Sequence, residues 1–412
     1  MSYGEWMHGP FGLDAPRGRT LPCERTAVVV VHNVTAGTRL GDVVPLLEED
    51  PRVQVVYTHP PSSLLSAGVR EFLARLGGVV VPWRQVTQTR FDLAVAASSG
   101  LLEWVPAPVI TLPHGVGYNK YPALWEGYGA VVPREAGGPE RGRQVWHGRT
   151  IASAIVLPTQ SQIERLRRSS PEAAGIAVAA GDPCYDRLAA SIPLRDRYRR
   201  ALGVRDRQLV AVSSTWGPGS LLNRHPGLLT ELVRQLPPRQ YQVAAIINPS
   251  VWHWNGVRQV RAWFADSIRG GLVLVPPEEG WRGVLAAADV LIGDHGSVTC
   301  YAASAGVPVL MAYPADEIEP GSPVARLAEM APRLVLGRPY AAQLAEAVSA
   351  WNPEQHRAIQ ALVTDVPGQS ARIIRSIMYR LLKLPEPAGE PEVSPVPVPR
   401  PVSFPETFGG DW

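Results

Sequence analysis

Short continuous apolar runs recur along the chain and alternate with segments whose apolar residues have helical spacing. Continuous runs rich in valine and isoleucine are typical of strands buried on both faces of a parallel sheet. In the first half the pattern predicts strands at residues 27–34, 53–59, 78–83, 91–98, 107–115 and 153–159, with helices at 62–77 and 161–169. In the second half it predicts strands at 208–216, 242–249, 272–277, 290–292, 307–312 and 333–337, with helices at 226–236, 257–268, 281–288, 297–305, 341–351 and 370–384.

The two series meet near residues 186–206 and predict an α/β fold of two Rossmann-like domains that face an interdomain cleft. One large α/β domain is the alternative. We expect an irregular N-terminal segment at residues 1–24, a first domain at 25–200 and a second domain at 201–384. Residues 385–412 are rich in proline and predict a tail that is disordered or in extended polyproline II conformation.

Composition narrows the class of protein. The formal net charge of the 412 residues is +3, which gives no support to a nucleic-acid partner. The three cysteines lie far apart, which argues against a disulfide framework and a structural zinc site. There is no apolar run of about 18 residues and no secretory signal pattern, so we expect a cytoplasmic protein. Peripheral contact with a membrane stays open.

The most informative stretch is residues 286–314, a buried strand that ends in the turn Gly293-Asp294-His295-Gly296 and opens a helix at Ser297. Such a turn directs backbone N–H groups and the positive end of a helix dipole at one spot, which suits a phosphate. Ser297 would face a diphosphate, Asp294 would hold the turn or accept bonds from a sugar hydroxyl, and His295 would stabilise charge on a leaving nucleotide. A plain helix-capping turn is the alternative.

Four segments resemble the CDP-glycerol glycerophosphotransferases that build teichoic acids, a group within the GT-B transferases. They are residues 289–312 (DVLIGDHGSVTCYAASAGVPVLMA), 111–120 (TLPHGVGYNK), 179–191 (AAGDPCYDRLAAS) and 210–222 (VAVSSTWGPGSLL). The resemblance implies that Asp294, Gly296 and Ser297 lie at the diphosphate of a nucleotide-activated donor. The first of these segments is also similar to UDP-GlcNAc 2-epimerases.

The chain departs from that family at two strand ends. The family has a His-Pro pair where this chain has Asn248-Pro249, and His253, which lies four residues beyond Pro249, is a candidate substitute. The family also has an arginine after its Thr-Trp pair, where Gly217 follows Trp216. We expect Thr215 and Asn248 to contact the donor.

His114 ends a predicted strand and is followed by Gly115. Because an imidazole titrates near neutral pH, His114 is a candidate general base for an acceptor hydroxyl, with a turn-capping role as the alternative. Gly115 would let the backbone approach the acceptor. Lys120 would contact a phosphate oxygen, or be an ordinary surface lysine. His253 is a further candidate contact to the acceptor or a phosphate.

These observations predict an enzyme that transfers a sugar or glycerophosphate from a CDP-, UDP-, GDP- or dTDP-linked donor to an acceptor hydroxyl. No Asp-x-Asp pair ends a strand, so we expect neither a metal ion nor a resident cofactor. A UDP-sugar 2-epimerase is one alternative. The other is an inactive nucleotide-sugar-binding or scaffold protein, in which Asn248 marks lost activity and the proline-rich tail binds a partner.

Overall fold

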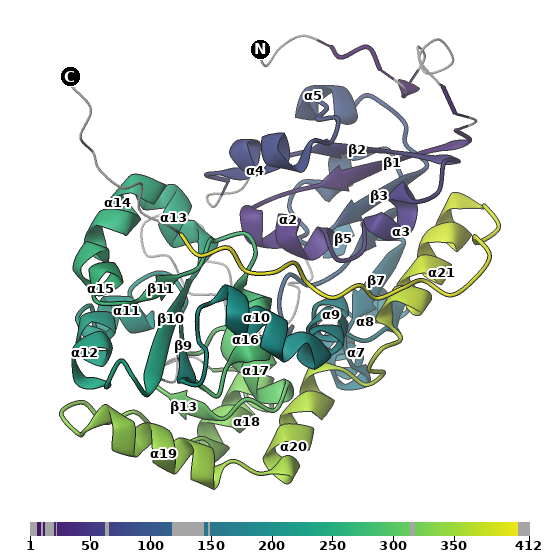
Figure 1. Ribbon diagram of the computed structural model, residues 1–412. Coiled ribbons are helices and arrows are strands. Elements are labelled where there is room, and N and C mark those ends of the chain that lie inside the picture. Colours follow the sequence, from purple (N-terminus) through teal and green to yellow (C-terminus); the bar gives the residue numbers. More distant parts are fainter. Residues whose placement is uncertain are drawn as a thin grey trace, which may run out of the picture.

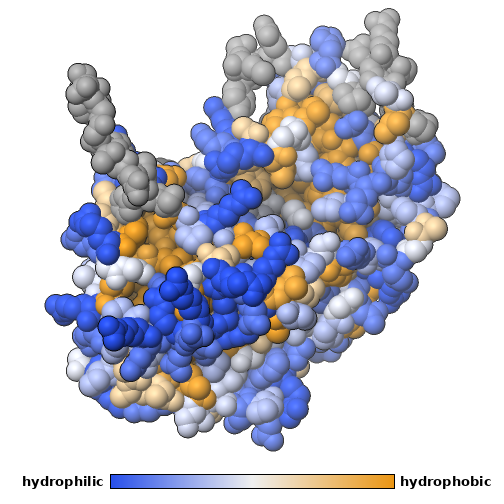
Figure 2. Space-filling view, viewed as in Figure 1, coloured by the Kyte–Doolittle hydropathy of each residue, from blue (hydrophilic) through white to orange (hydrophobic). Residues whose placement is uncertain are grey.

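The computed structural model describes residues 6–9, 11–12, 20–21, 23–61, 66–117, 144–146, 149–313 and 318–402. These residues form two lobes, each built on its own parallel sheet (Figure 1). Figure 2 shows the molecular surface hollowed between the two lobes. The predicted class, an α/β fold of two Rossmann-like domains, is confirmed.

The first sheet has strand order β2-β1-β3-β4-β7-β8, and all its neighbours pair in parallel. Val80 adds a parallel bridge to Tyr57 at the β2 edge, which extends the order to that of a Rossmann sheet. The strands are β1 (Arg25–Val30), β2 (Val53–Thr58), β3 (Leu93–Ala96), β4 (Val109–Thr111), β7 (Ala154–Leu157) and β8 (Ala177–Ala179); β5 (Val145–Trp146) and β6 (Arg149–Thr150) form a separate antiparallel pair.

The second sheet has strand order β11-β10-β9-β12-β13, again parallel throughout. Its strands are β9 (Gln208–Ser214), β10 (Tyr241–Ile247), β11 (Val273–Leu274), β12 (Val290–Gly293) and β13 (Val309–Met311). In both sheets the strand order reverses beside the first strand, which opens a crevice at the carboxyl ends of the strands.

Both sheets are buried on both faces, as the continuous apolar runs predict. In β1, Ala27 and Val29 pack in one apolar cluster while Val28 and Val30 pack in the other. The same alternation holds for β9, because successive side chains of a strand point to opposite faces.

Helices cover the faces of the first sheet (Figure 1). They are α2 (Val34–Leu40), α3 (Pro45–Glu48), α4 (Val69–Leu76), α5 (Trp83–Val86), the 3₁₀ helix η2 (Leu102–Trp104), α7 (Gln160–Ser169) and α8 (Pro171–Ala174). Those of the second lobe are α11 (Leu221–Arg224), α12 (Leu228–Gln235), α13 (Pro249–Asn255), α14 (Val257–Trp263), α15 (Ala265–Arg269), α16 (Trp281–Ala287), α17 (Ser297–Ser304), α18 (Pro323–Met330), α19 (Tyr340–Ala350) and α20 (Pro353–Val363).

The remaining helices connect the lobes. Leu188 of α9 (Pro183–Ser191) and Tyr198 of α10 (Arg195–Ala201) lie in the apolar core of the second sheet; the 3₁₀ helix η3 (Ile192–Leu194) joins these helices. Conversely, Ile374 and Met378 of α21 (Ser370–Leu382) pack in the core of the first sheet. The range expected for the first domain, 25–200, therefore includes residues that pack in the core of the second sheet. The range expected for the second domain, 201–384, includes α21, which packs in the core of the first sheet.

Residues 385–402 run from α21 back to the second lobe without forming a helix or strand (Figure 1, yellow). Val396 is 4% exposed and its carbonyl accepts a hydrogen bond from the Tyr198 hydroxyl at 2.8 Å. The Val402 N–H donates to the Leu274 carbonyl at the sheet edge, also at 2.8 Å. Because these groups are paired, residues 385–402 are not disordered, and of the two predicted alternatives they follow the extended one, without helix or strand. Residues 403–412 lie outside the described part of the chain.

Candidate active site

A cavity of about 490 Å³ lies between the two lobes. It is lined from the first sheet by residues that follow β1, β3 and β4, and from the second by residues that follow β9, β10 and β12. Ligands bind at this edge in open parallel sheets, because the strand order reverses there and loops diverge. The volume is in the usual range for a small-molecule site of about 300–1,000 Å³.

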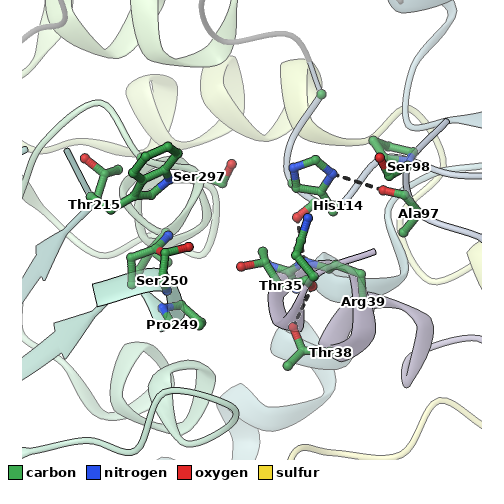
Figure 3. A pocket seen from close by; sticks show the side chains of 18 of the residues that line it. Thr35, Thr38, Arg39, Ala97, Ser98, His114, Thr215, Pro249, Ser250 and Ser297 are labelled. Atoms are coloured by element: carbon green, nitrogen blue, oxygen red, sulfur yellow. Dashed lines mark hydrogen bonds between the residues drawn. The ribbon is translucent and has the colours of Figure 1, made fainter. Parts of the chain in front are cut away.

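His114 forms part of the first-domain wall, two residues after Leu112 at the end of the β4 region (Figure 3). Its Nδ1 lies 3.0 Å from the Ala97 carbonyl oxygen. A carbonyl only accepts hydrogen bonds, so Nδ1 carries the proton and Nε2 of the neutral ring keeps its lone pair. The side chain is exposed toward the cavity. Although the ring is open to the cavity, the protein atoms around it reduce its hydration, which lowers the pKa of His114 from 6.5; the Ala97 bond opposes this shift, and the nearby Arg39 charge adds to it.

The first turn of α17 forms the opposite wall. Gly296 is the N-cap residue, and Ser297 is the first residue of the helix. A glycine has no side chain to cap the helix, and the Thr299 N–H already donates to the Gly296 carbonyl, so the N–H groups of Ser297 and Val298 are left for a ligand. A Cβ atom at Gly296 would lie 2.6 Å from Thr215 Cγ2, which explains why glycine fits this turn. Figure 3 shows Ser297 and Thr215 across the cavity from His114.

The two walls touch at Gly115. The Ser297 hydroxyl accepts a long hydrogen bond of 3.4 Å from the Val116 N–H. A Cβ atom at Gly115 would lie 2.5 Å from that same hydroxyl oxygen. Gly115 is therefore required for close approach of the two domains, and it also lines the cavity beside His114.

Asp294 does not line the cavity. It is fully buried, and its Oδ2 accepts hydrogen bonds from the Thr215 N–H and hydroxyl, both 2.8 Å, and from the Leu221 N–H at 3.0 Å. Its Oδ1 accepts a bond from the Gly296 N–H at 3.1 Å. Asp294 therefore does not make the predicted contact with the donor. It has the other predicted role, because its carboxylate holds together the turns that follow β9 and β12.

Three other predicted donor contacts do line the cavity. Thr215, Asn248 and His295 all lie in its wall. The Thr215 hydroxyl donates to Asp294, and the Asn248 Oδ1 caps α13 by accepting from the Ser250 N–H at 2.9 Å. His295 is 6% exposed. Asn248 therefore keeps its side-chain NH₂ as the group able to contact a ligand.

The prediction that His253 contacts the acceptor or a phosphate is wrong, because this side chain does not line the cavity. It lies on α13 but outside the cavity lining, with Nε2 3.8 Å from a Glu278 carboxylate oxygen at the contact between the lobes. Its ring is packed so closely on Gly68 that a Cβ atom there would lie 2.0 Å from Nδ1. It cannot replace the histidine absent at Asn248. Lys120 lies outside the described residues.

Several cavity residues were not predicted. Thr35, Thr38 and Arg39 of α2 and Ser98 after β3 form the wall around His114 (Figure 3). With Ser213, Ser214, Ser250 and others they give the cavity many hydroxyl groups, and no carboxylate is among the described lining residues. These residues follow β1 and β3, the two strands between which the strand order of the sheet reverses. Ligands bind at that point in parallel sheets, so this position is the signal that could have identified them.

No protein-family model and no curated protein matches the sequence. Solved structures match over most of their length. The wall teichoic acid polymerase TagF is 13% identical, with a TM-score of 0.59 over 87% of this chain and 89% of that chain. The S. aureus MnaA–UDP co-structure is 12% identical (TM-score 0.53; 90% and 100% covered). UDP-GlcNAc 2-epimerase from Neisseria meningitidis, bound to UDP-GlcNAc, is also 12% identical (TM-score 0.50; 86% and 100%). The chain therefore has the GT-B fold of these proteins.

Proposed function

We propose that this chain is an enzyme that binds a nucleotide-activated donor in the interdomain cavity and transfers a sugar or glycerophosphate to an acceptor hydroxyl. One observation carries the proposal: a neutral histidine with a free Nε2 lone pair and an uncapped helix N-terminus face each other across one cavity. The first group suits a proton acceptor, and the second suits a departing phosphate.

In the proposed reaction, His114 Nε2 removes the proton of the acceptor hydroxyl while the hydroxyl oxygen attacks the donor. The attack falls on the anomeric carbon of a sugar or on the phosphorus of a glycerophosphate. The bond from that atom to the nucleotide oxygen breaks, and its electron pair leaves with the nucleotide. The Ala97 carbonyl holds the ring in the required tautomer and stabilises the imidazolium that forms.

The departing nucleotide phosphate lies against the first turn of α17. There the Ser297 hydroxyl and the N–H groups of Ser297 and Val298 donate to its oxygens, and the helix dipole favours negative charge. Preorganised donors of this kind stabilise charge without reorganising during the reaction. Because no carboxylate is among the described lining residues, no negatively charged side chain there repels the phosphate.

The donor class is supported by the names of the fold neighbours. TagF was solved after soaking with CDPG, and MnaA was solved with UDP. We extend this to the present chain as a preference for CDP- or UDP-linked donors, with GDP- and dTDP-linked donors to be tested beside them. The Asn248-Pro249 pair, where the resemblance implies histidine, removes one titratable group from the second-domain wall. It leaves His114 as the candidate base.

The test begins with calorimetric titration of the full chain with CDP-glycerol and with UDP-, GDP- and dTDP-sugars, followed by turnover assays on hydroxyl acceptors. We expect His114→Ala to lower turnover by roughly 10²- to 10⁴-fold while donor affinity stays within about twofold. His225→Ala is the control, since that side chain pairs with Glu231 away from the cavity lining.

The outcomes separate the alternatives. A sugar product formed without any acceptor would favour a UDP-sugar 2-epimerase. Donor binding without turnover by the wild-type chain would favour the binding or scaffold protein. Turnover that survives His114→Ala at full rate would overturn the assignment of the base.

A further inference from the structure

Arg39 lies in the cavity wall close to His114 (Figure 3). Apart from the histidines, it is the one ionisable side chain among the described residues that line the cavity. It comes from α2, directly after β1, and is 7% exposed. A guanidinium stays charged in proteins at any physiological pH, so the first-domain wall carries a nearly buried positive charge.

The two groups that accept hydrogen bonds from this guanidinium are uncharged. Arg39 Nε donates to the His114 carbonyl at 3.3 Å, and Nη1 donates to the Cys184 sulfur. Burial raises the pKa of the Cys184 thiol to about 12, so this sulfur is uncharged near neutral pH. The guanidinium carbon also lies 5.0 Å from the ring centre of Trp281 and 5.1 Å from that of Tyr301. Aromatic faces favour a cation but do not neutralise it.

The nearby carboxylates make their shorter contacts with other groups, although the buried Oδ2 of Asp42 accepts no hydrogen bond from the described residues. Asp42 Oδ1 pairs with Arg187 at 2.8 Å and with Arg282 at 2.6 Å. Arg39 Nη1 approaches only Oδ2, at 3.8 Å, which is too long for a hydrogen bond. Asp182 accepts from the Tyr301 hydroxyl at 2.7 Å and from the Tyr185 N–H at 3.0 Å. Arg39 is therefore the arginine of this cluster with the weakest ion pair, and it is also the one in the cavity wall.

Buried charges in proteins are normally paired with an opposite charge that also accepts their hydrogen bonds. We propose that Arg39 binds an anionic group of the ligand, a phosphate or carboxylate, at the first-domain side of the cavity. The planar guanidinium, preorganised by the two aromatic rings, suits bidentate recognition of such a group. This inference rests on the proposed function, because it assumes that the cavity is the ligand site.

The anionic group has two possible sources, the diphosphate of the donor or a charged acceptor, and matched probes distinguish them. CDP and UDP are titrated beside the uncharged nucleosides cytidine and uridine. Glycerol 3-phosphate is then titrated beside glycerol, in the presence of saturating nucleotide. The titrations use the full-length chain at one pH and one salt concentration, since charge recognition is screened by salt.

We expect Arg39→Gln to weaken binding of one charged probe by about 30-fold or more, with the uncharged counterparts unaffected. Arg39→Lys keeps the positive charge but loses the planar guanidinium that can bind two oxygens at once, and should weaken binding of the same probe by about 3- to 10-fold. Arg187→Gln is the matched control: it removes another partner of Asp42 without touching the cavity lining. We expect its affinities to stay within about threefold of wild type.

Where Arg39→Gln fails to fold, Arg39→Met is the second variant, because the long unbranched methionine side chain can fill the space beside the two aromatic rings. Loss confined to CDP and UDP assigns the anion to the donor, and loss confined to glycerol 3-phosphate assigns it to the acceptor; both support the proposal. A folded Arg39→Gln or Arg39→Met that binds every probe like wild type overturns it. A wild-type chain that binds no nucleotide instead overturns the proposed function.

Discussion

The pH dependence of the proposed reaction is set by His114. The base must be neutral, and reduced hydration lowers the pKa of His114 from 6.5 in the folded chain. The neutral form is therefore dominant at pH 7 and is lost only as the pH falls through a value below 6.5. We expect kcat/KM to stay level between pH 7 and 8 and to fall on an acid limb below 6.5. Rates measured from pH 5 to 8 test this, and an acid limb centred above 6.5 would contradict it.

Asp294 and Ser297 lie three positions apart in one motif but have different roles. Asp294→Ala would leave the buried N–H groups of Leu221 and Gly296 and both donors of Thr215 without their acceptor. We expect a loss of about 3 kcal/mol or more in the free energy of unfolding. Ser297→Ala removes one long hydrogen bond and should cost less than about 1 kcal/mol while weakening donor binding. Denaturant titration of both variants tests the difference, and equal stabilities would refute it.

At the scale of elements, the apolar pattern predicts the central strands well and the edges poorly. Residues 78–83 were expected to form a strand but contribute only the Val80 bridge, because Pro82 and α5 follow at once. The helix expected at 257–268 is divided at Phe264 into α14 and α15. The three-residue strand β8 and the short helix α13 were not predicted. Such short elements hold few apolar positions, so tertiary pairing decides them.

The proline-rich residues 385–402 make contacts with the second lobe that we expect to stabilise the fold. Truncation after Leu384 would leave the fully buried Tyr198 hydroxyl without its acceptor and would uncover Gly283, on which Pro399 packs. We expect the melting temperature to fall by about 3 °C or more. Truncation after Val402 is the control, because it leaves every described contact of the tail in place. Equal melting temperatures for the two truncated chains would show that the tail contributes nothing to stability.

At the scale of the whole molecule, the cavity exists because two sheets present their carboxyl edges to each other. Asp42 of the first lobe pairs with Arg282 of the second, and Gly115 meets Ser297. The chain then returns through α21 and the tail, so each lobe is braced by segments distant in sequence. No helix of the described residues is both long and apolar enough to cross a membrane.

The amino-acid pattern alone predicts the two strand–helix series, the parallel sheets and the strand ends that carry His114 and Ser297. Those features are local, because apolar periodicity and glycine-rich turns are read within a few residues. The folded structure was needed to find that Asp294 is buried beneath the site, that His253 faces Glu278 and that Arg39 lines the cavity. These outcomes depend on which strands are neighbours and how the lobes meet, and no local pattern encodes contacts between residues so far apart in the chain.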